Sequence, residues 1–361
     1  MDSYVQLRAK LAAHPAGAPD SQEILEILRI LFSPEEAAVA LHLPFRPMRD
    51  IDIAERAGLT ADEVVARCES MADKGLVYAY EARGRHFYML FPTAPGLFEF
   101  PMMKHGQLDL PYDRLSELWD SYYRSGWGAE MIGDATHMAR VIPIDEAIQA
   151  QQTVLSFDEV SGYLERAKYI SVQDCACRVA NHRCEAPVDV CLALDYGAKY
   201  LSERGMGRLI TREEAQAVLR RAHDAGLVQM TSNTRDKVEF ICNCCSCCCG
   251  LLGTVTRLGG AAHSIASNFL CRVAASECIA CGLCEAACPV GAISVDDVAS
   301  ICDEQCIGCG VCVPQCPQGA LALVRRESTS VPPVDQQALL LEVAAEKGRL
   351  DRFAKELGSQ E

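Results

Sequence analysis

Cysteines are the residues of this chain best suited to chemistry, and near the C-terminal end they repeat one spacing. Each run reads C-x2-C-x2-C-x3-C-P. Three thiolates at this spacing surround one corner of an iron–sulfur cube, and the fourth cysteine ligates the other cube of the pair. The spacing therefore predicts two [4Fe–4S] clusters with crossed ligand sets. The predicted sets are Cys278, Cys281, Cys284 and Cys316 for one cluster, and Cys306, Cys309, Cys312 and Cys288 for the other.

The two runs form an internal repeat. When 278–295 is aligned with 306–323, nine of eighteen positions are identical, including two glycines that let the backbone approach a cluster. The segment closely resembles the bacterial-type ferredoxin domain with two [4Fe–4S] clusters, and the resemblance implies single-electron transfer. A zinc site is the alternative, but zinc ribbons use paired C-x2-C units rather than triplets that end in Cys-Pro.

A second group of cysteines occupies 170–250. It begins with Cys175-Ala176-Cys177-Arg178 and ends with six cysteines in the eight residues from Cys242 to Cys249. This stretch resembles a cysteine-rich module of 4Fe–4S-binding proteins of anaerobes, where a C-x-C-R segment accompanies a C-N-C-C segment. We expect a third centre here, an iron–sulfur cluster with zinc as the rival.

The ligands of that third centre are drawn from both segments. Neighbouring cysteines on a strand face opposite sides, so all six cysteines of 242–249 cannot serve one cluster. Arg178 is placed to offset thiolate charge, Cys184 is a spare ligand, and Cys191 and Cys68 are expected to be small buried hydrophobes. The predicted ligands are Cys242, Cys244, Cys245 and Cys248, with Cys175 and Cys177 closing the site.

The elements that must position these residues suggest an α+β multidomain chain. In 21–92, helix-capping serine and threonine residues precede two helices, and a hairpin turns at Gly84. This unit resembles a winged helix. It holds eight basic and twelve acidic residues, which disfavours DNA binding and favours protein docking.

Four further regions complete the predicted organisation. A linker and helical region is followed by the cysteine-rich module, which we expect to be mainly helical. The ferredoxin domain and an amphipathic helix, which begins after Val331-Pro332-Pro333, follow it. The predicted boundaries of these four regions are 93–169, 170–255, 271–325 and 334–361.

Composition limits the class of protein. The net charge is −15, which disfavours nucleic acid and anionic membranes as partners and suits docking to basic patches on redox proteins. Sixteen of 21 cysteines lie between 242 and 316, as expected of local metal ligands rather than disulfides. The chain has no signal segment and no apolar stretch of membrane-spanning length, so we expect a soluble, cytoplasmic protein.

Three functions fit these patterns. No nucleotide-binding or flavin-binding motif is recognisable, so the electron donor and acceptor should lie on other proteins, such as a flavoprotein or a reductase. The leading hypothesis is an electron-transfer protein or subunit. The alternatives are a component of a redox enzyme with a catalytic cluster in 170–255, and an iron–sulfur transcriptional sensor. Nothing in the sequence specifies an oligomeric state.

Overall fold

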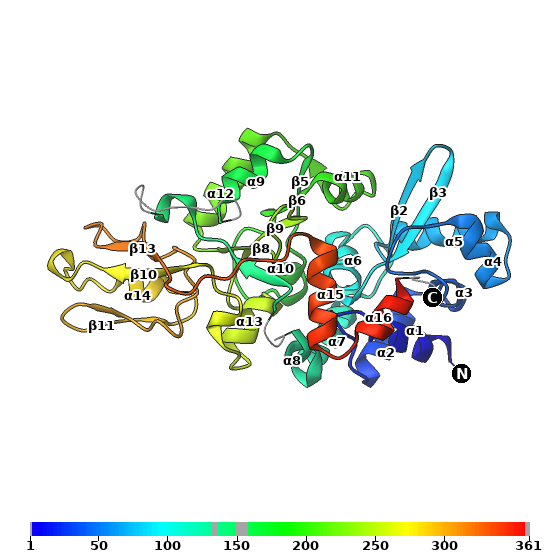
Figure 1. Cartoon of the computed structure of the whole chain (residues 1–361), viewed down its shortest axis with the longest axis horizontal. Helices are drawn as coiled ribbons and strands as arrows, with labels where there is room; N and C mark the ends of the chain where they lie inside the picture. Colours follow the sequence, from blue (N-terminus) through cyan, green and yellow to red (C-terminus); the bar gives the residue numbers. More distant parts are fainter. Residues whose placement is uncertain (1, 132–135, 149–157, 358–361) are drawn as a thin grey trace.

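The computed structural model describes residues 2–131, 136–148 and 158–357, which form three bodies along one axis (Figure 1). Helices from both ends of the chain make up one end of the molecule. A six-stranded sheet lies in the middle, and the predicted ferredoxin domain, 271–325, which we call the ferredoxin segment, forms the other end. Among the described residues, no helix combines the length and apolar character needed to cross a membrane.

The N-terminal unit consists of five helices and a three-stranded antiparallel sheet in the order β1-β3-β2. Two helices begin at capping boxes, one between Ser33 and Glu36 and one between Thr60 and Glu63, as their spacing predicts. Gly84, at a φ of 70°, turns the hairpin. The elements are α1 (Ser3–Leu11), α2 (Gln22–Leu31), α3 (Pro34–Ala40), β1 (Met48–Arg49), α4 (Asp50–Ala57), α5 (Ala61–Asp73), β2 (Val77–Ala82) and β3 (Arg85–Leu90).

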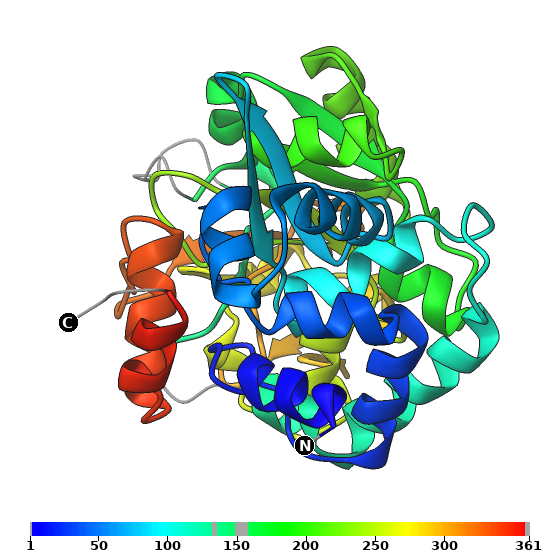
Figure 2. The same ribbon diagram turned by 90° about the vertical axis from the view of Figure 1, so that its right-hand side faces the viewer.

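The C-terminal segment packs back onto this unit as two helices rather than one. They are α15 (Gln336–Glu346) and α16 (Leu350–Glu356), separated at Gly348, whose φ of 62° breaks the helix. Figure 2 shows both helices beside the N-terminal ones. Phe353 is buried there, with its ring centroid 5.3 Å from that of His14. The last four residues of the predicted region, 358–361, lie outside the described residues.

The region between the N-terminal unit and the sheet is helical over its first half. It contains α6 (Glu99–Met103), α7 (Tyr112–Tyr122) and α8 (Gly128–Met131). Trp119 and Trp127 belong to the same hydrophobic core as the N-terminal helices. Residues 132–135 and 149–157 of the predicted 93–169 region lie outside the described residues.

Helices hold more of the residues of the cysteine-rich module than strands do, but the module is built on a sheet that the sequence did not predict. All neighbouring strands are antiparallel, in the order β4-β8-β9-β6-β5-β7. The strands are only two to five residues long, and cysteines occupy several inward positions, so their alternation is hard to recognise in the sequence. The strands are β4 (Ala139–Val141), β5 (Ile170–Gln173), β6 (Cys191–Leu194), β7 (Arg208–Leu209), β8 (Val228–Ser232) and β9 (Phe240–Cys244).

The two faces of this sheet have different roles. Leu192 and Ile241, which are cross-strand partners, pack against α9 (Val160–Arg166) and α12 (Arg212–Asp224). Because side chains alternate along a strand, Cys191 and Cys242 share the opposite face. Three more helices, α10 (Ala176–Asn181), α11 (Asp195–Glu203) and α13 (Gly250–Thr256), complete the module.

The ferredoxin segment packs against the β4 edge of this sheet. Its longer strand pair joins β10 (Phe269–Val273) to β13 (Leu321–Arg325). The backbone N–H of Ile144 donates to the carbonyl of Cys309 at 3.1 Å, so the segment after β4 touches the second cysteine run directly. The remaining elements are α14 (Leu283–Ala287), β11 (Ile293–Val295) and β12 (Ala299–Ile301).

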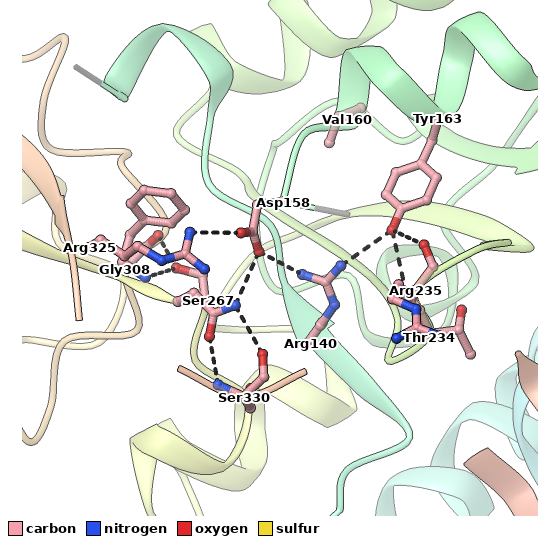
Figure 3. Close-up of polar contacts among 12 residues, drawn as sticks. Arg140, Asp158, Val160, Tyr163, Thr234, Arg235, Ser267, Gly308, Arg325 and Ser330 are labelled. Atoms are coloured by element: carbon pink, nitrogen blue, oxygen red, sulfur yellow. Dashed lines mark hydrogen bonds and ion pairs between the residues drawn. The ribbon is translucent and has the colours of Figure 1, made fainter. Parts of the chain in front are cut away.

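A buried carboxylate fastens the two bodies together (Figure 3). Asp158 is fully buried and lies 3.3 Å from a guanidinium nitrogen of Arg325 in the ferredoxin segment. Its other oxygen lies 3.9 Å from Arg140 in β4 and accepts a hydrogen bond from Asn268 at 3.3 Å. Arg140 also donates to the hydroxyl of Tyr163 in α9. One negative charge thus bridges cations from both bodies.

Candidate iron–sulfur and metal centres

The outer end of the ferredoxin segment holds one group of four cysteines around a small cavity. Backbone N–H groups donate to two of the sulfurs, from Ala299 to Cys278 at 3.4 Å and from Ala320 to Cys316 at 3.3 Å. Such bonds stabilise thiolates that ligate a cluster. The Cys281 side chain is exposed, so this site reaches the molecular surface. The cysteines lining the cavity are Cys278, Cys281, Cys284 and Cys316.

A second group lies at the inner end, against the sheet. Cys306, Cys309 and Cys312 are each 7–8% exposed, and burial raises the pKa of the Cys309 thiol. Cys288 is close enough to Cys309 for its thiolate charge to raise the pKa of Cys309 further. The Cys288 sulfur accepts a hydrogen bond from the backbone N–H of Ala292 at 3.2 Å. The inner group is thus the more deeply buried of the two.

The structure divides the cysteines of 170–250 into two groups, because side chains alternate along β9 and the loop after it turns back between Cys245 and Cys249. The first group is a tight tetrad, which we call the tetrad from here on. Its sulfurs all lie within 4.8 Å of one another, with separations of 3.7 Å between Cys184 and Cys245 and 3.8 Å between Cys247 and Cys248. The tetrad consists of Cys184, Cys245, Cys247 and Cys248.

The second group is a closed ring of six thiols, which we call the ring. Each thiol is close enough to interact with two others of the group, so that the six interactions form a closed circuit. Four of the six side chains are only 4–7% exposed. In order around the ring, the thiols are Cys175, Cys191, Cys242, Cys244, Cys249 and Cys177.

Arg178 lies between the tetrad and the ring. Its guanidinium donates to the carbonyl of Asn243 at 2.9 Å and to the Cys245 sulfur at 3.8 Å. The side chain is 3% exposed, and within the described residues its two other nitrogens have no hydrogen-bond acceptor. Burial alone lowers the pKa of Arg178, but thiolate charge on Cys175 and Cys191 raises it overall. A buried cation with free donors fits an anionic thiolate–sulfide centre.

Two further arginines hold the loop that connects β9 to α13. Arg257 donates to the carbonyls of Ser246 at 3.2 Å and Cys249 at 3.0 Å. Arg183 donates to the carbonyl of Cys247 at 3.3 Å. In an acidic chain this concentration of cations around one loop offsets the negative charge of its thiolates.

The ring opens onto a cavity of about 900 Å³ that lies between the sheet and the N-terminal body. All six ring cysteines line it, opposite Phe98, Trp119 and Trp127. Glu99 also lines the cavity, and burial raises its pKa to about 8 although it accepts a hydrogen bond from the backbone N–H of Gly96. The cavity thus places thiols, aromatic rings and one carboxyl group around a common space.

These positions regroup the residues predicted from the sequence. Cys175, Cys177, Cys242 and Cys244 lie together in the ring, whereas Cys245 and Cys248 lie in the tetrad. Cys184, expected as a spare, is a full member of the tetrad. Cys68 is fully buried in the N-terminal core, as predicted.

Sequence reasoning missed three members of these groups, namely Cys191, Cys247 and Cys249. Cys191 is buried as expected, but it lies directly opposite Cys242 across β6 and β9. Strand pairing would have been the signal, and no local pattern reveals which strands pair. Cys271, also outside every pattern, accepts a hydrogen bond from the Cys312 thiol at 3.6 Å.

Comparison with known proteins identifies only the ferredoxin segment. Residues 277–320 match the family of 4Fe-4S dicluster domains. No curated protein and no solved structure matches the chain. The segment is therefore an iron–sulfur domain, and its donor set of thiolates with amide N–H groups fits such clusters.

Proposed function

We propose that this protein relays single electrons between redox partners through two [4Fe–4S] clusters. The observation that carries the proposal is the duplicated cysteine run of the dicluster domain, in which one group reaches the surface at Cys281 and the other has three buried members. A cluster of this kind gains or loses one electron with little movement of its atoms. The crossed ligand sets predicted from the spacing are retained in the proposal.

The position of the two sites suggests a direction for the relay. The outer site reaches the surface at Cys281, and the apolar side chains of Ile279 and Leu283 beside it are 59% and 51% exposed. The inner site shares one hydrophobic core with Cys244 and Cys249 of the ring. A partner such as a flavoprotein or a reductase would exchange electrons at the outer site, and the inner site would pass them toward the ring.

The ring is our candidate for the third iron–sulfur centre. Six thiols surround a space too wide for one ion, since no three of them lie within 4.8 Å of one another in the described structure. They line a cavity and have Arg178 beside them, which suits a polynuclear anionic cluster. This proposal keeps four of the predicted ligands, Cys175, Cys177, Cys242 and Cys244, and adds Cys191 and Cys249.

Iron analysis and low-temperature EPR of anaerobically purified protein test this assignment. Two cubes contain eight irons, and we expect more than eight in the full chain because of the third centre. Changing Cys242 and Cys244 together to serine should remove only the excess iron. Cys302→Ser is the matched control, because this exposed cysteine lies outside every group. Eight irons or fewer in the unmodified chain would contradict the third centre. A chain that contains zinc and no iron would contradict the relay function.

The cavity favours a second candidate function, that of a redox enzyme whose ring cluster acts on a bound molecule. A space of about 900 Å³ is the size of a small-molecule site, and its aromatic lining suits an apolar substrate. Exposing reduced protein to carbon monoxide or cyanide tests for an open coordination position. A change in the EPR signal of the third centre, with the ferredoxin signals unaltered, supports this candidate. If neither the signal of the third centre nor the ferredoxin signals change, the enzyme candidate is contradicted and only the relay function stands.

We also propose that the N-terminal unit is a winged helix used for protein contacts and not for DNA. Its α5, the helix that would enter a major groove, is partly covered by α11. Arg204, which follows α11, forms 2.8 Å ion pairs with Glu69 and Asp73 of α5. The remaining exposed side of α5 carries Asp62 and Glu63, which repel phosphate.

A further inference from the structure

We propose that the tetrad binds a single Zn²⁺ ion in a closed tetrahedral site that is separate from the iron–sulfur centres. The tetrad brings together Cys184, from the loop after α10, and three cysteines from the loop between β9 and α13. The inference depends on the separations between the sulfur atoms, and it stands whether or not the relay function is correct.

The separations match one shared metal ion. A zinc–thiolate bond is about 2.3 Å long, and four sulfurs at the corners of a tetrahedron around one ion are therefore about 3.8 Å apart. Two pairs of the tetrad are 3.7 and 3.8 Å apart, and no pair exceeds 4.8 Å. A small closure of the loop would bring the remaining pairs to the same value.

The other cysteine groups provide an internal comparison. In a [4Fe–4S] cube each thiolate binds a different iron and points away from the centre, so the sulfurs lie farther apart than around one ion. Among the described residues, no three of the eight ferredoxin cysteines lie within 4.8 Å of one another, and no three ring cysteines do. The sulfur atoms of the predicted cluster sites are therefore farther apart than those of the tetrad.

Zinc is favoured over iron by the chemistry of the donors. Four thiolates leave no open coordination position, which is typical of structural zinc sites. Zn²⁺ also binds such soft ligands more tightly than Fe²⁺ does. The site would carry a net negative charge, and Arg178, which donates to the Cys245 sulfur at 3.8 Å, offsets it.

The ion would link two of the three segments that carry the ring, leaving out β6 with Cys191. Cys245 directly follows Cys244 of the ring, and Cys248 directly precedes Cys249. Cys184 belongs to the segment that supplies Cys175 and Cys177. The other side-chain bonds across this junction include those from Asn181 to the Cys248 carbonyl and from Arg183 to the Cys247 carbonyl, both at 3.3 Å. The metal-bound tetrad would therefore fix the positions of the ring thiols on these two segments relative to one another.

Metal analysis and zinc-edge X-ray absorption of the full chain, purified anaerobically, test the proposal. We expect about one zinc per chain, surrounded by four sulfurs at about 2.3 Å. Cys184→Ser and Cys247→Ser should each lower the zinc content about tenfold while the ferredoxin EPR signals persist, which shows that the variants fold. Cys302→Ser should keep the zinc, because its side chain is exposed and lies outside the tetrad.

Three results would overturn the proposal. The first is an unmodified chain that contains iron but no zinc. The second is zinc that is retained in both tetrad variants, because the ion would then occupy another site. The third is an absorption spectrum in which nitrogen or oxygen replaces sulfur around the ion, or in which a second metal lies close to it. The spectrum of the unmodified chain decides the question even where a variant fails to fold.

Discussion

At the scale of single residues, burial fixes which groups carry charge. Thiolate charge on Cys175 and Cys191 outweighs the effect of burial on Arg178 and keeps it charged, whereas burial keeps His14 neutral. His14 is 4% exposed, accepts a hydrogen bond from the Ala16 N–H at 3.1 Å and lies between Phe45 and Phe353. Burial lowers its pKa to about 3, and nearby Lys347 contributes to the shift.

This shift predicts that acid destabilises the N-terminal body. The pKa is lower in the folded than in the unfolded chain, so protonation below the unfolded pKa of 6.5 favours unfolding. Between pH 7 and pH 5 the free energy of unfolding should fall by about 2 kcal/mol more in the native chain than in His14→Gln. Urea unfolding followed by tryptophan fluorescence measures this, because Trp119 and Trp127 both belong to the core beside His14. Equal pH dependence of the two proteins would contradict the prediction.

At the scale of elements, the two cysteine runs follow the same backbone path. They differ in whether a side chain fits at the position between their first two cysteines. Gly308 in the second run has a φ of 64°, and Ala280 occupies the same place in the first run with a φ of 53°. The difference lies in the neighbour. A Cβ atom on Gly308 would lie 2.1 Å from the carbonyl oxygen of Phe269 in β10, whereas Ala280 is partly exposed to solvent.

We therefore expect Gly308→Ala to displace the second run and abolish the inner cluster. Gly319→Ala is the matched control, because its φ of 63° imposes the same backbone strain while a Cβ atom there has no neighbour within 4 Å. The control should cost only about 1–2 kcal/mol. Iron content and the EPR signals of the two variants distinguish the cases. Full iron in Gly308→Ala would show that β10 can move aside.

At the scale of the whole molecule, the relay requires the ferredoxin segment to stay seated on the sheet. Asp158 is central to that contact, with Arg140 on one side and Arg325 on the other (Figure 3). Removing one partner of a buried ion pair leaves the remaining charges uncompensated. Exposed ion pairs contribute far less, because water screens them.

Asp158→Asn should therefore destabilise the protein by about 3 kcal/mol, as measured by denaturant unfolding. Asp303→Asn removes a comparable carboxylate from its pair with Arg272, but both side chains there are about half exposed. That control should change stability by less than about 1 kcal/mol. Similar losses in the two variants would show that Asp158 is not the main contact between the bodies.

The distribution of charge over the whole molecule also predicts a negative result. Selection of the full chain against random DNA duplexes, with the clusters oxidised and then reduced, should enrich no sequence. The physical reasons are the net charge of −15 and the partial covering of α5 by α11. Enrichment of one motif with low nanomolar affinity would instead support a transcriptional sensor.

The sequence alone determined the features that are local in the chain. Two cysteine runs with fixed spacing predict an iron–sulfur domain, because each triplet of ligands lies within a few residues of backbone. Capping residues such as Ser33 and Thr60 likewise fix helix starts, since a cap and its partner are three residues apart.

Only the tertiary structure decided how the cysteines of 170–250 are grouped. Antiparallel pairing of β6 and β9 sets Cys191 opposite Cys242, and strand alternation separates Cys244 from Cys245. The cavity beside the ring also depends on packing between the sheet and the N-terminal body. Spacing along the chain cannot specify which distant segments meet, because that choice follows from burying the apolar faces of short strands together.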